Sequence, residues 1–157
     1  MKLFKKLRWV IIVIFMMVLL AGCQSEDVSY QYYSQEKLRN TLEQGSSIVI
    51  LDIQVEEDFN AHHIEGAIAT YAFPVNSDED KTKLDGQVQT LEKSSDDIVI
   101  VCPLGRVGAE RTYAYLLERG ISAERLFILE EGQSGWNRNL EDLNTIEETE
   151  ETDSEDT

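Results

Sequence analysis

Cys102 is the residue of this chain best suited to nucleophilic chemistry. It follows the apolar run Ile98–Val101 and begins the segment CPLGRVG, after which AERTYAYLLERG has a helical pattern. A loop between a strand and a helix N-terminus directs backbone N–H groups at the sulfur and at an anion bound beside it. These groups and Arg106 favour the thiolate, the form of cysteine that attacks and carries sulfur. The sequence therefore predicts a reactive thiol. The alternative is a buried cysteine that packs as a small apolar side chain.

His62, His63 and Asp52 are further candidates for a chemical role. Two adjacent histidines with no other cysteine or histidine near them make a poor zinc site, so we expect no metal to be bound. Asp52 ends an apolar run, where a carboxylate could act as a general base. We expect it instead to cap or pair within the turn that follows.

Residues 1–22 have the layout of a secretory signal. Basic residues and no acidic one precede the apolar run Trp9–Ala21, which is shorter than the roughly 20 residues that span a bilayer. The segment Leu20-Ala21-Gly22-Cys23 is similar to the lipobox of bacterial lipoprotein signal peptides. That similarity implies cleavage before Cys23, a lipid on its sulfur, and attachment to the outer face of a cell membrane. The alternative is an uncleaved membrane anchor with an incidental Cys23, which also places the folded part outside the cytoplasm.

The chain has two cysteines, Cys23 and Cys102. If Cys23 carries lipid, no disulfide can form within the chain. An unpaired thiol outside the cytoplasm usually has a use or is hidden. This supports a chemical role for Cys102.

The charge of the chain excludes some classes of partner. Residues 23–157 contain 10 basic and 30 acidic residues, a net charge of −20. Nucleic acids and anionic lipid headgroups are therefore poor ligands, and an anionic substrate must be held by local dipoles. Residues 141–157 contain nine acidic residues and no basic one, which predicts a disordered acidic tail. A role for this tail as a spacer or in attracting metal ions is the alternative.

Apolar runs alternate with helical patterns between the two ends. We expect strands at 47–53, 67–72, 97–102 and 125–129, and helices at 35–44, 55–60, 76–93 and from the CPLGRVG loop to Gly120. The helix at 76–93 is expected to break at Asp85-Gly86, and a loop is expected to lead to Trp136. The alternation predicts an α/β fold with a parallel sheet, helices on both faces and right-handed crossovers. Ligands of such sheets bind at the carboxyl ends of the strands, where Cys102 lies.

The predicted organisation is a signal peptide at 1–22, a tether at 23–33, one domain at 34–140 and the acidic tail at 141–157. About 42% of the residues are apolar, which is enough for one core. Ala109, Tyr113, Leu116 and Leu117 share one helical stripe and are expected in that core.

Three segments together resemble the rhodanese homology domain. They are LDIQVEEDFNAHHIEGAI, the loop CPLGRVG, and LEEGQSGW, and they lie in the expected order within about 34–140. The resemblance implies a rhodanese-like fold and a sulfurtransferase that needs no cofactor. Cys102 would attack the outer sulfur of thiosulfate or a related donor and release sulfite. It would then pass the sulfur, held as a persulfide, to a thiophilic acceptor such as cyanide or a thiol.

The loop after the cysteine would bind the substrate. A persulfide anion is best stabilised by inward N–H donors, here those of Leu104, Gly105, Arg106, Val107 and Gly108. Arg106 would also meet the sulfonate of thiosulfate, and the alternative is a surface pair with Glu110. Phosphatase relatives place an arginine six positions after the cysteine, where this chain has Gly108. The shorter loop argues against phosphatase and arsenate reductase activity.

Two positions depart from the family pattern. Gln54 replaces an arginine, which reduces a charge pair with Asp52 to a hydrogen bond, and Glu131 replaces the first glycine of a glycine pair. Glu131 is expected near the mouth of the site, where a carboxylate weakens the binding of a dianion. The sequence thus leaves two other functions open. One is a non-catalytic binding module, and the other is a persulfide or thiol relay to an envelope partner.

Overall fold

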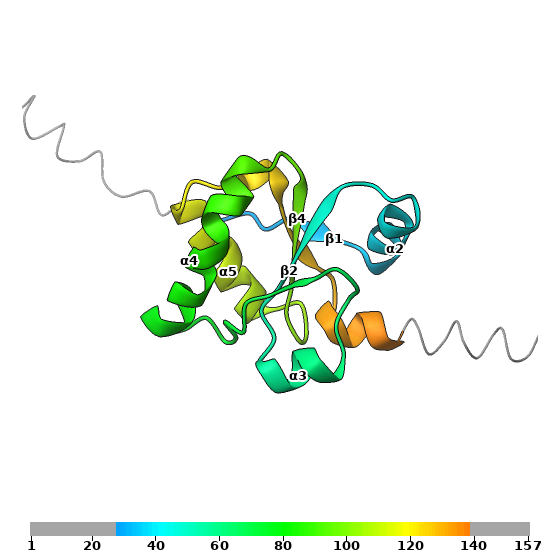
Figure 1. The fold of residues 1–157 in the computed structure, drawn as a ribbon, viewed down its shortest axis with the longest axis horizontal. Helices are drawn as coiled ribbons and strands as arrows, with labels where there is room; N and C mark the ends of the chain where they lie inside the picture. The colour runs from blue at the N-terminus through cyan, green and yellow to red at the C-terminus, as the bar shows by residue number, and fades with distance from the viewer. Residues whose placement is uncertain (1–27, 139–157) are drawn as a thin grey trace, which may run out of the picture.

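Five strands form the centre of the computed structural model, which describes residues 28–138 (Figure 1). They are β1 (Tyr32–Tyr33), β2 (Ile48–Asp52), β3 (Ile68–Ala69), β4 (Asp97–Val101) and β5 (Leu126–Leu129). Their order in the sheet is β1-β5-β4-β2-β3, and each neighbouring pair is parallel. The predicted parallel α/β sheet in a single domain is therefore confirmed. The predicted signal peptide, Cys23 and acidic tail lie outside the described residues.

The helices are α2 (Gln35–Glu43), α3 (Glu56–Ala61), α4 (Asp78–Lys93) and α5 (Val107–Glu118). A 3-10 turn, η1 (Ala123–Arg125), precedes β5, and residues 132–138 are also helical. Within the described residues no helix is long and apolar enough to cross a membrane.

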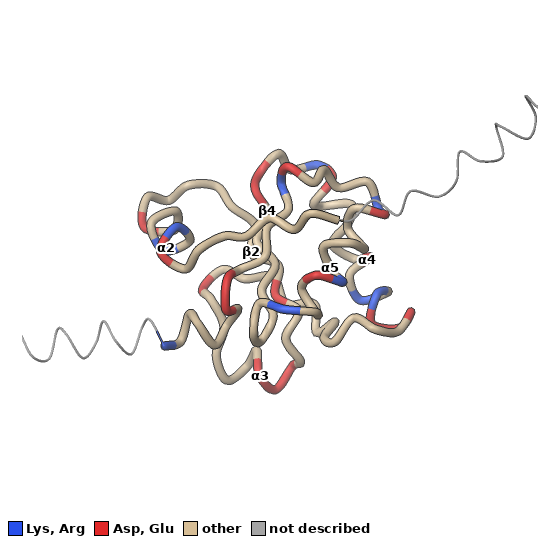
Figure 2. Tube along the Cα trace, turned by 180° about the vertical axis from the view of Figure 1, so that it is seen from behind, with Lys and Arg blue, Asp and Glu red and all other residues tan. Residues whose placement is uncertain are grey.

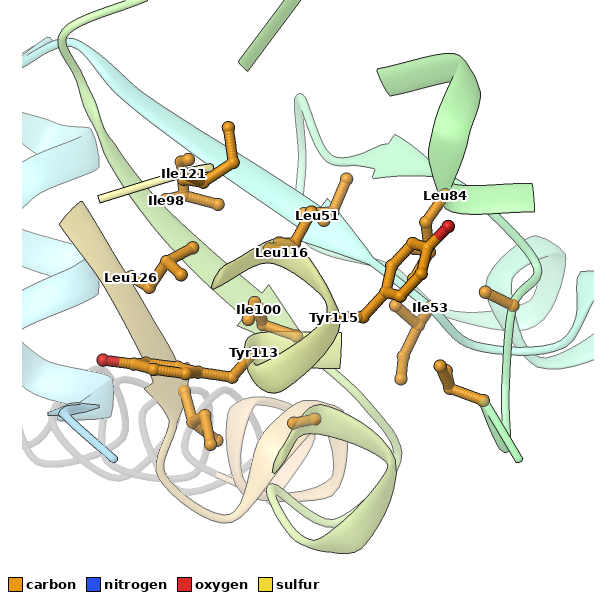
Figure 3. Packing of buried hydrophobic residues seen from close by; sticks show 14 of the residues in the cluster. Leu51, Ile53, Leu84, Ile98, Ile100, Tyr113, Tyr115, Leu116, Ile121 and Leu126 are labelled. Atoms are coloured by element: carbon orange, nitrogen blue, oxygen red, sulfur yellow. The ribbon is translucent and has the colours of Figure 1, made fainter. Parts of the chain in front are cut away.

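One face of the sheet packs against α4 and α5. Ile98 and Ile100 of β4 belong to the same apolar cluster as Tyr113 and Leu116 of α5, and all four are fully buried. Figure 3 shows these side chains between the sheet and α5. The predicted helical stripe is therefore core, as its spacing indicated, although Leu117 is only partly buried at the margin.

The opposite face packs against α2 and the helix at 132–138. Val99 and Val101, which alternate with the isoleucines of β4, cluster with Leu38 of α2 and with Trp136. Successive side chains of a strand point to opposite faces, so a continuous apolar run indicates that both faces are covered. Helices on both faces are thus confirmed.

The chain reverses its direction across the sheet between β2 and β4. From β2 it moves outward to β3, then returns through α4 to β4 on the other side of β2. Asp52 and Val101, the last residues of β2 and β4, are in register. Open parallel sheets bind ligands outside the carboxyl ends of the strands at such a reversal. Cys102 follows Val101 directly and lies there.

The helix ends follow local sequence signals. The Ser34 hydroxyl accepts from the Lys37 N–H at 3.1 Å and begins α2, as predicted. Ser77 and Asp80 form a capping box at the start of α4. Gly120 has a φ of 87° just beyond α5, a left-handed conformation that glycine adopts at helix C-termini.

The predicted break in α4 is wrong. The helix is continuous through Asp85 and Gly86, and a side chain at Gly86 would meet open space. A glycine inside an exposed helix costs only about 1 kcal/mol relative to alanine. Leu84 and Leu91, both fully buried, hold the segments on either side against the core, and this packing outweighs the cost.

Three other boundaries differ from the sequence expectations. Tyr32 and Tyr33, expected in the tether, form β1 against β5, and Tyr33 is buried. The strand expected at 67–72 pairs only at Ile68–Ala69. Trp136 lies in a helix, not at the end of a loop. In each case pairing or packing with distant segments decides the local structure, so local propensity did not reveal it.

Candidate functional site

The thiol of Cys102 lies at the base of the loop between β4 and α5, and the residue is only 2% exposed. The Gly105 N–H donates to its Sγ at 3.1 Å, and the Arg106 N–H donates at 3.4 Å. The N–H groups of Leu104, Val107 and Gly108 form no hydrogen bond with this sulfur in the described part of the chain. Two of the five predicted donors, the N–H groups of Gly105 and Arg106, therefore point at the sulfur.

The N-terminus of α5 adds a second electrostatic contribution. This helix begins at Val107, and its N-cap residue, Arg106, forms no side-chain cap. The free N–H groups of a first helical turn carry partial positive charge, which attracts anions. The loop and the helix together therefore direct N–H groups toward the position where an anion beside the sulfur would lie.

The turn after β5 holds the carbonyl side of the cysteine loop. The Gln133 N–H donates to the Cys102 carbonyl at 2.9 Å, and the Ser134 N–H donates to the Pro103 carbonyl at 3.1 Å. With these two carbonyls bound outside the loop, the amides of Gly105 and Arg106 turn toward the sulfur. We call residues 130–134, which follow β5, the second loop. Its hydrogen bonds support the cysteine loop.

Two glycines allow these loops to approach each other. Gly105 and Gly132 have φ values of 63° and 57°. A Cβ on Gly132 would lie 2.0 Å from the Cys102 carbonyl oxygen and 2.5 Å from the Gly105 nitrogen. A Cβ on Gly105 would lie 2.4 Å from the Leu129 carbonyl oxygen. Both positions require glycine for space as well as for backbone conformation.

Gln35, at the start of α2, holds the second loop from the other side. Its Nε2 donates to the Gly132 carbonyl at 3.0 Å and also to the Glu130 carbonyl. Sequence reasoning did not identify this residue. A glutamine in the first turn of a helix is ordinary in a sequence, and only the sheet order, with β1 beside β5, brings it to the site.

Replacing Gln35 by methionine, which keeps the length of the side chain and removes the donor, is expected to loosen the cysteine loop. The carbonyl of the buried Gly132 loses its partner, and so does that of the exposed Glu130. The free energy of unfolding should therefore fall by about 1 kcal/mol. Alkylation of Cys102 by iodoacetamide should change in rate. Gln31→Met is the matched control, because Gln31 donates to the Ala123 and Leu126 carbonyls at the other end of β5. Equal changes in alkylation for both variants would show that Gln35 acts on stability alone.

The outer residues of the cysteine loop face solvent. Leu104 is 55% exposed and Val107 is 50% exposed. Arg106 is exposed as well, and its guanidinium forms no ion pair with any described residue. The alternative pairing with Glu110 is therefore not formed in the described structure.

Asp52 and Gln54 brace the turn after β2. The Gln54 N–H donates to one Asp52 carboxylate oxygen at 2.8 Å, and Gln54 Nε2 donates to the other at 3.0 Å. Gln54 Nε2 also donates to the His62 carbonyl at 3.2 Å. Asp52 therefore pairs within the turn, as expected, and the glutamine replaces a charge pair by hydrogen bonds.

Burial raises the pKa of Asp52, and the hydrogen bonds from Gln54 oppose this only in part. Because the folded state binds the proton more tightly, the free energy of unfolding falls as the pH rises from the usual aspartate range through the raised pKa. Asp52→Asn removes this dependence of stability on pH, because asparagine does not titrate. It keeps one side-chain oxygen that can accept from the Gln54 backbone N–H. Urea unfolding between about pH 3 and pH 7 should show the variant gaining stability over wild type as the pH rises. A difference that is constant with pH would contradict this expectation.

His63 makes structural contacts through its ring, and His62 accepts a hydrogen bond through its backbone carbonyl. His63 stacks on Phe59 with ring centroids 4.1 Å apart, and its Nδ1 lies 2.9 Å from the Phe59 carbonyl oxygen. Residues 28–138 contain no group of three side chains that could hold a metal ion.

Glu131 lies on the turn that supports the cysteine loop. It adopts a left-handed conformation with a φ of 58°, is exposed, and forms an ion pair with Arg138. The pair partly neutralises the carboxylate, so its repulsion of an anion is weaker than the sequence suggested.

Comparisons with known proteins agree with the fold. A family model described as the rhodanese-like domain matches residues 34–139. No curated protein matches the chain. Among solved structures, the rhodanese-like domain of an Anabaena protein shares 24% identity, covering 70% of this chain and 75% of that one with a TM-score of 0.55.

Two further structures have similar folds. The As-Sb reductase of Leishmania major has a TM-score of 0.57 at 18% identity, covering 73% of this chain and 81% of its own. A thiosulfate sulfurtransferase of Pseudomonas aeruginosa has a TM-score of 0.53 at 18% identity, covering 71% of this chain and 18% of its own. At these identities the likeness concerns the fold alone.

Proposed function

The chain belongs to the rhodanese-like domain family, and from this membership we propose that it is a sulfurtransferase that carries sulfur as a persulfide on Cys102. The observation that carries the proposal is the pair of N–H groups, from Gly105 and Arg106, that donate to the Cys102 sulfur. Donors fixed before the reaction stabilise the negative charge of a thiolate and of a persulfide without reorganisation. No metal or other cofactor is needed for this chemistry.

In the first half-reaction the Cys102 thiolate attacks the outer sulfur of thiosulfate or a related donor. The S–S bond of the donor breaks, sulfite leaves with the electron pair, and a persulfide forms on Cys102. Leu104, Gly105, Arg106, Val107 and Gly108 make up the proposed substrate-binding loop. The guanidinium of Arg106, which forms no ion pair with a described residue, meets the sulfonate group. In the second half-reaction a thiophilic acceptor attacks the outer sulfur of the persulfide and restores the thiolate.

Mass spectrometry of the purified protein before and after incubation with thiosulfate tests this proposal. The expected result is the gain of one sulfur atom on wild type, removed again by cyanide with formation of thiocyanate. An unchanged mass on wild type would overturn the proposal, as would the same gain on Cys102→Ser.

A non-catalytic binding module is the second candidate, because Cys102 is 2% exposed and a donor has little direct access to it. This function predicts that a partner is retained by both wild type and Cys102→Ser while wild type produces no thiocyanate. Partner retention by Cys102→Ser and thiocyanate production by wild type therefore separate the two candidates.

We also propose that Cys23 carries a lipid that holds the domain on the outer face of the cell membrane. The proposal rests on the basic and apolar residues that precede Leu20-Ala21-Gly22-Cys23. More than one acyl chain gives stable anchoring, whereas a single chain is marginal. Fractionation of cells expressing wild type and Cys23→Ser tests it. Wild type should sediment with membranes and incorporate labelled fatty acid, and incorporation by Cys23→Ser would contradict the assignment.

A further inference from the structure

Exposed apolar side chains gather at the edge of the sheet where Cys102 lies. Val55, Leu104 and Val107 are 38%, 55% and 50% exposed, and they are three of the five large apolar residues that stand out to solvent in residues 28–138. The other two, Val28 and Tyr32, lie near the start of the described chain. Leu104 and Val107 follow β4 and Val55 follows β2, so these three exposed side chains lie on the two segments that leave neighbouring strands. Exposed apolar side chains grouped in this way mark a surface that contacts another molecule.

The pairing of β2 with β4 places the residues that follow these two strands at the same end of the sheet, beyond the carboxyl ends of the strands. Asp52 of β2 and Val101 of β4 are paired, and the Ile53 N–H donates to the Val101 carbonyl at 2.9 Å. Val55 and Leu104 each follow one member of that pair by three residues. We call Val55, Leu104 and Val107 the apolar rim.

Acidic side chains lie directly beside the apolar rim. Glu56, Glu57 and Asp58 form the first turn of α3, immediately after Val55, and all three are exposed. None of them forms an ion pair with a described residue, and residues 40–80 contain no lysine or arginine. Figure 2 shows these acidic positions on α3. The face around the thiol therefore combines apolar contact with three exposed carboxylates on α3, which outnumber the one exposed guanidinium of the cysteine loop, that of Arg106.

We propose that the sulfur acceptor is a partner protein that docks on this face and presents a cysteine set among apolar and basic residues. The inference rests on the proposed persulfide chemistry and adds the class of acceptor. The S–S bond of a persulfide is about 2 Å long, so the outer sulfur extends from the recessed Cys102 toward the apolar rim. A flat apolar and basic surface reaches it there, and opposite charge increases the rate of encounter.

The transfer conserves atoms and electrons. The partner thiol loses its proton to solvent, and the resulting thiolate attacks the outer sulfur of the Cys102 persulfide. The bond between the Cys102 sulfur and the outer sulfur breaks as the new S–S bond forms. Cys102 regains its thiolate and the partner leaves as a persulfide, so no external oxidant or reductant is required.

Two synthetic peptides of equal length and a small thiol test the acceptor class. One peptide has its cysteine between leucine and lysine residues, the other has it between serine and glutamate residues, and the small thiol is 2-mercaptoethanol. The full chain is loaded with thiosulfate, and transfer is followed by mass spectrometry at low salt. Each rate is divided by the rate of the same thiol with a small aromatic disulfide, which removes differences in intrinsic nucleophilicity. The expected result is about tenfold faster normalised transfer to the leucine and lysine peptide.

Substitutions outside the cysteine loop separate docking from chemistry. Val55→Ser and Glu57→Lys should each slow transfer to the leucine and lysine peptide several-fold and leave both loading and transfer to 2-mercaptoethanol unchanged. Glu124→Lys is the matched control. It makes the same charge change in η1, which precedes β5. Because β5 is parallel to β4, η1 lies at the end of the sheet opposite to Cys102.

Three results would have distinct meanings. Equal normalised transfer to both peptides by a normally loaded protein would overturn the acceptor proposal alone. An effect of Glu124→Lys as large as that of Glu57→Lys would overturn the assignment of the face. Failure of wild type to load would overturn the sulfurtransferase function itself.

Discussion

Cys102→Ser is expected to lower thiocyanate production from thiosulfate and cyanide by about 10³-fold or more, because a hydroxyl cannot form the persulfide on which both half-reactions depend. Serine is slightly smaller than cysteine, and the Gly105 and Arg106 N–H groups that donate to Sγ can donate to its oxygen. The fold should therefore survive, with a change in unfolding free energy on the order of 1 kcal/mol. Thiocyanate assays and urea unfolding on the same preparations separate lost chemistry from lost structure.

Cys23→Ser is the control for this experiment, since it removes the other cysteine of the chain. Assayed in detergent, it should retain the turnover of wild type. If Cys102→Ser retained turnover and Cys23→Ser lost it, the nucleophile would be misassigned.

Gly132→Ala is expected to have the next largest effect, although residue 132 carries no reacting atom. Its Cβ would lie 2.0 Å from the Cys102 carbonyl oxygen, and the neighbouring Leu104 and Gly105 nitrogens would be within 2.9 and 2.5 Å. All three are backbone atoms, so the cysteine loop itself must move. Left-handed strain and overpacking together should cost about 3 kcal/mol of unfolding free energy. A displacement near 1 Å at the reacting group should cost about 10²-fold in turnover.

Two other glycines separate the causes of this effect. Gly45 has the same left-handed conformation but open space around it, so Gly45→Ala tests strain alone and should cost about 1 kcal/mol with turnover intact. Gly86 lies inside α4 with open space around it, and Gly86→Ala should stabilise the protein by about 0.5 to 1 kcal/mol. If Gly132→Ala matched Gly45→Ala in both stability and turnover, contact between the loops would not matter.

The cysteine loop was predictable because its signals are local. A thiol after a continuous apolar run, a glycine-containing turn and a helical pattern are each visible within about fifteen residues of sequence. The turn between Asp52 and Gln54 was predictable for the same reason, since the two residues are neighbours in the chain. The roles assigned to Cys102 and to residues 104–108 remain predictions that the proposed experiments test.

The support of the loop was not predictable in this way. Gln35 and Gly132 are separated by 97 residues, yet they meet through one hydrogen bond. The two residues of β1 form a strand only because β5 offers them an open edge. The continuity of α4 through Gly86 likewise follows from the burial of Leu84 and Leu91, because burial free energy exceeds the local preference for a turn.

The sequence by itself thus determined the class of fold, the family resemblance and the thiol on which the proposed chemistry depends. Only the tertiary structure decided which amides face the sulfur, which distant loop holds them there, and which apolar and acidic side chains surround the site. The physical reason is the distance along the chain over which each kind of interaction acts. Periodicity, capping and turn preferences act between near neighbours in the chain, whereas the shape of this site arises from contacts between segments that meet only after the sheet has formed.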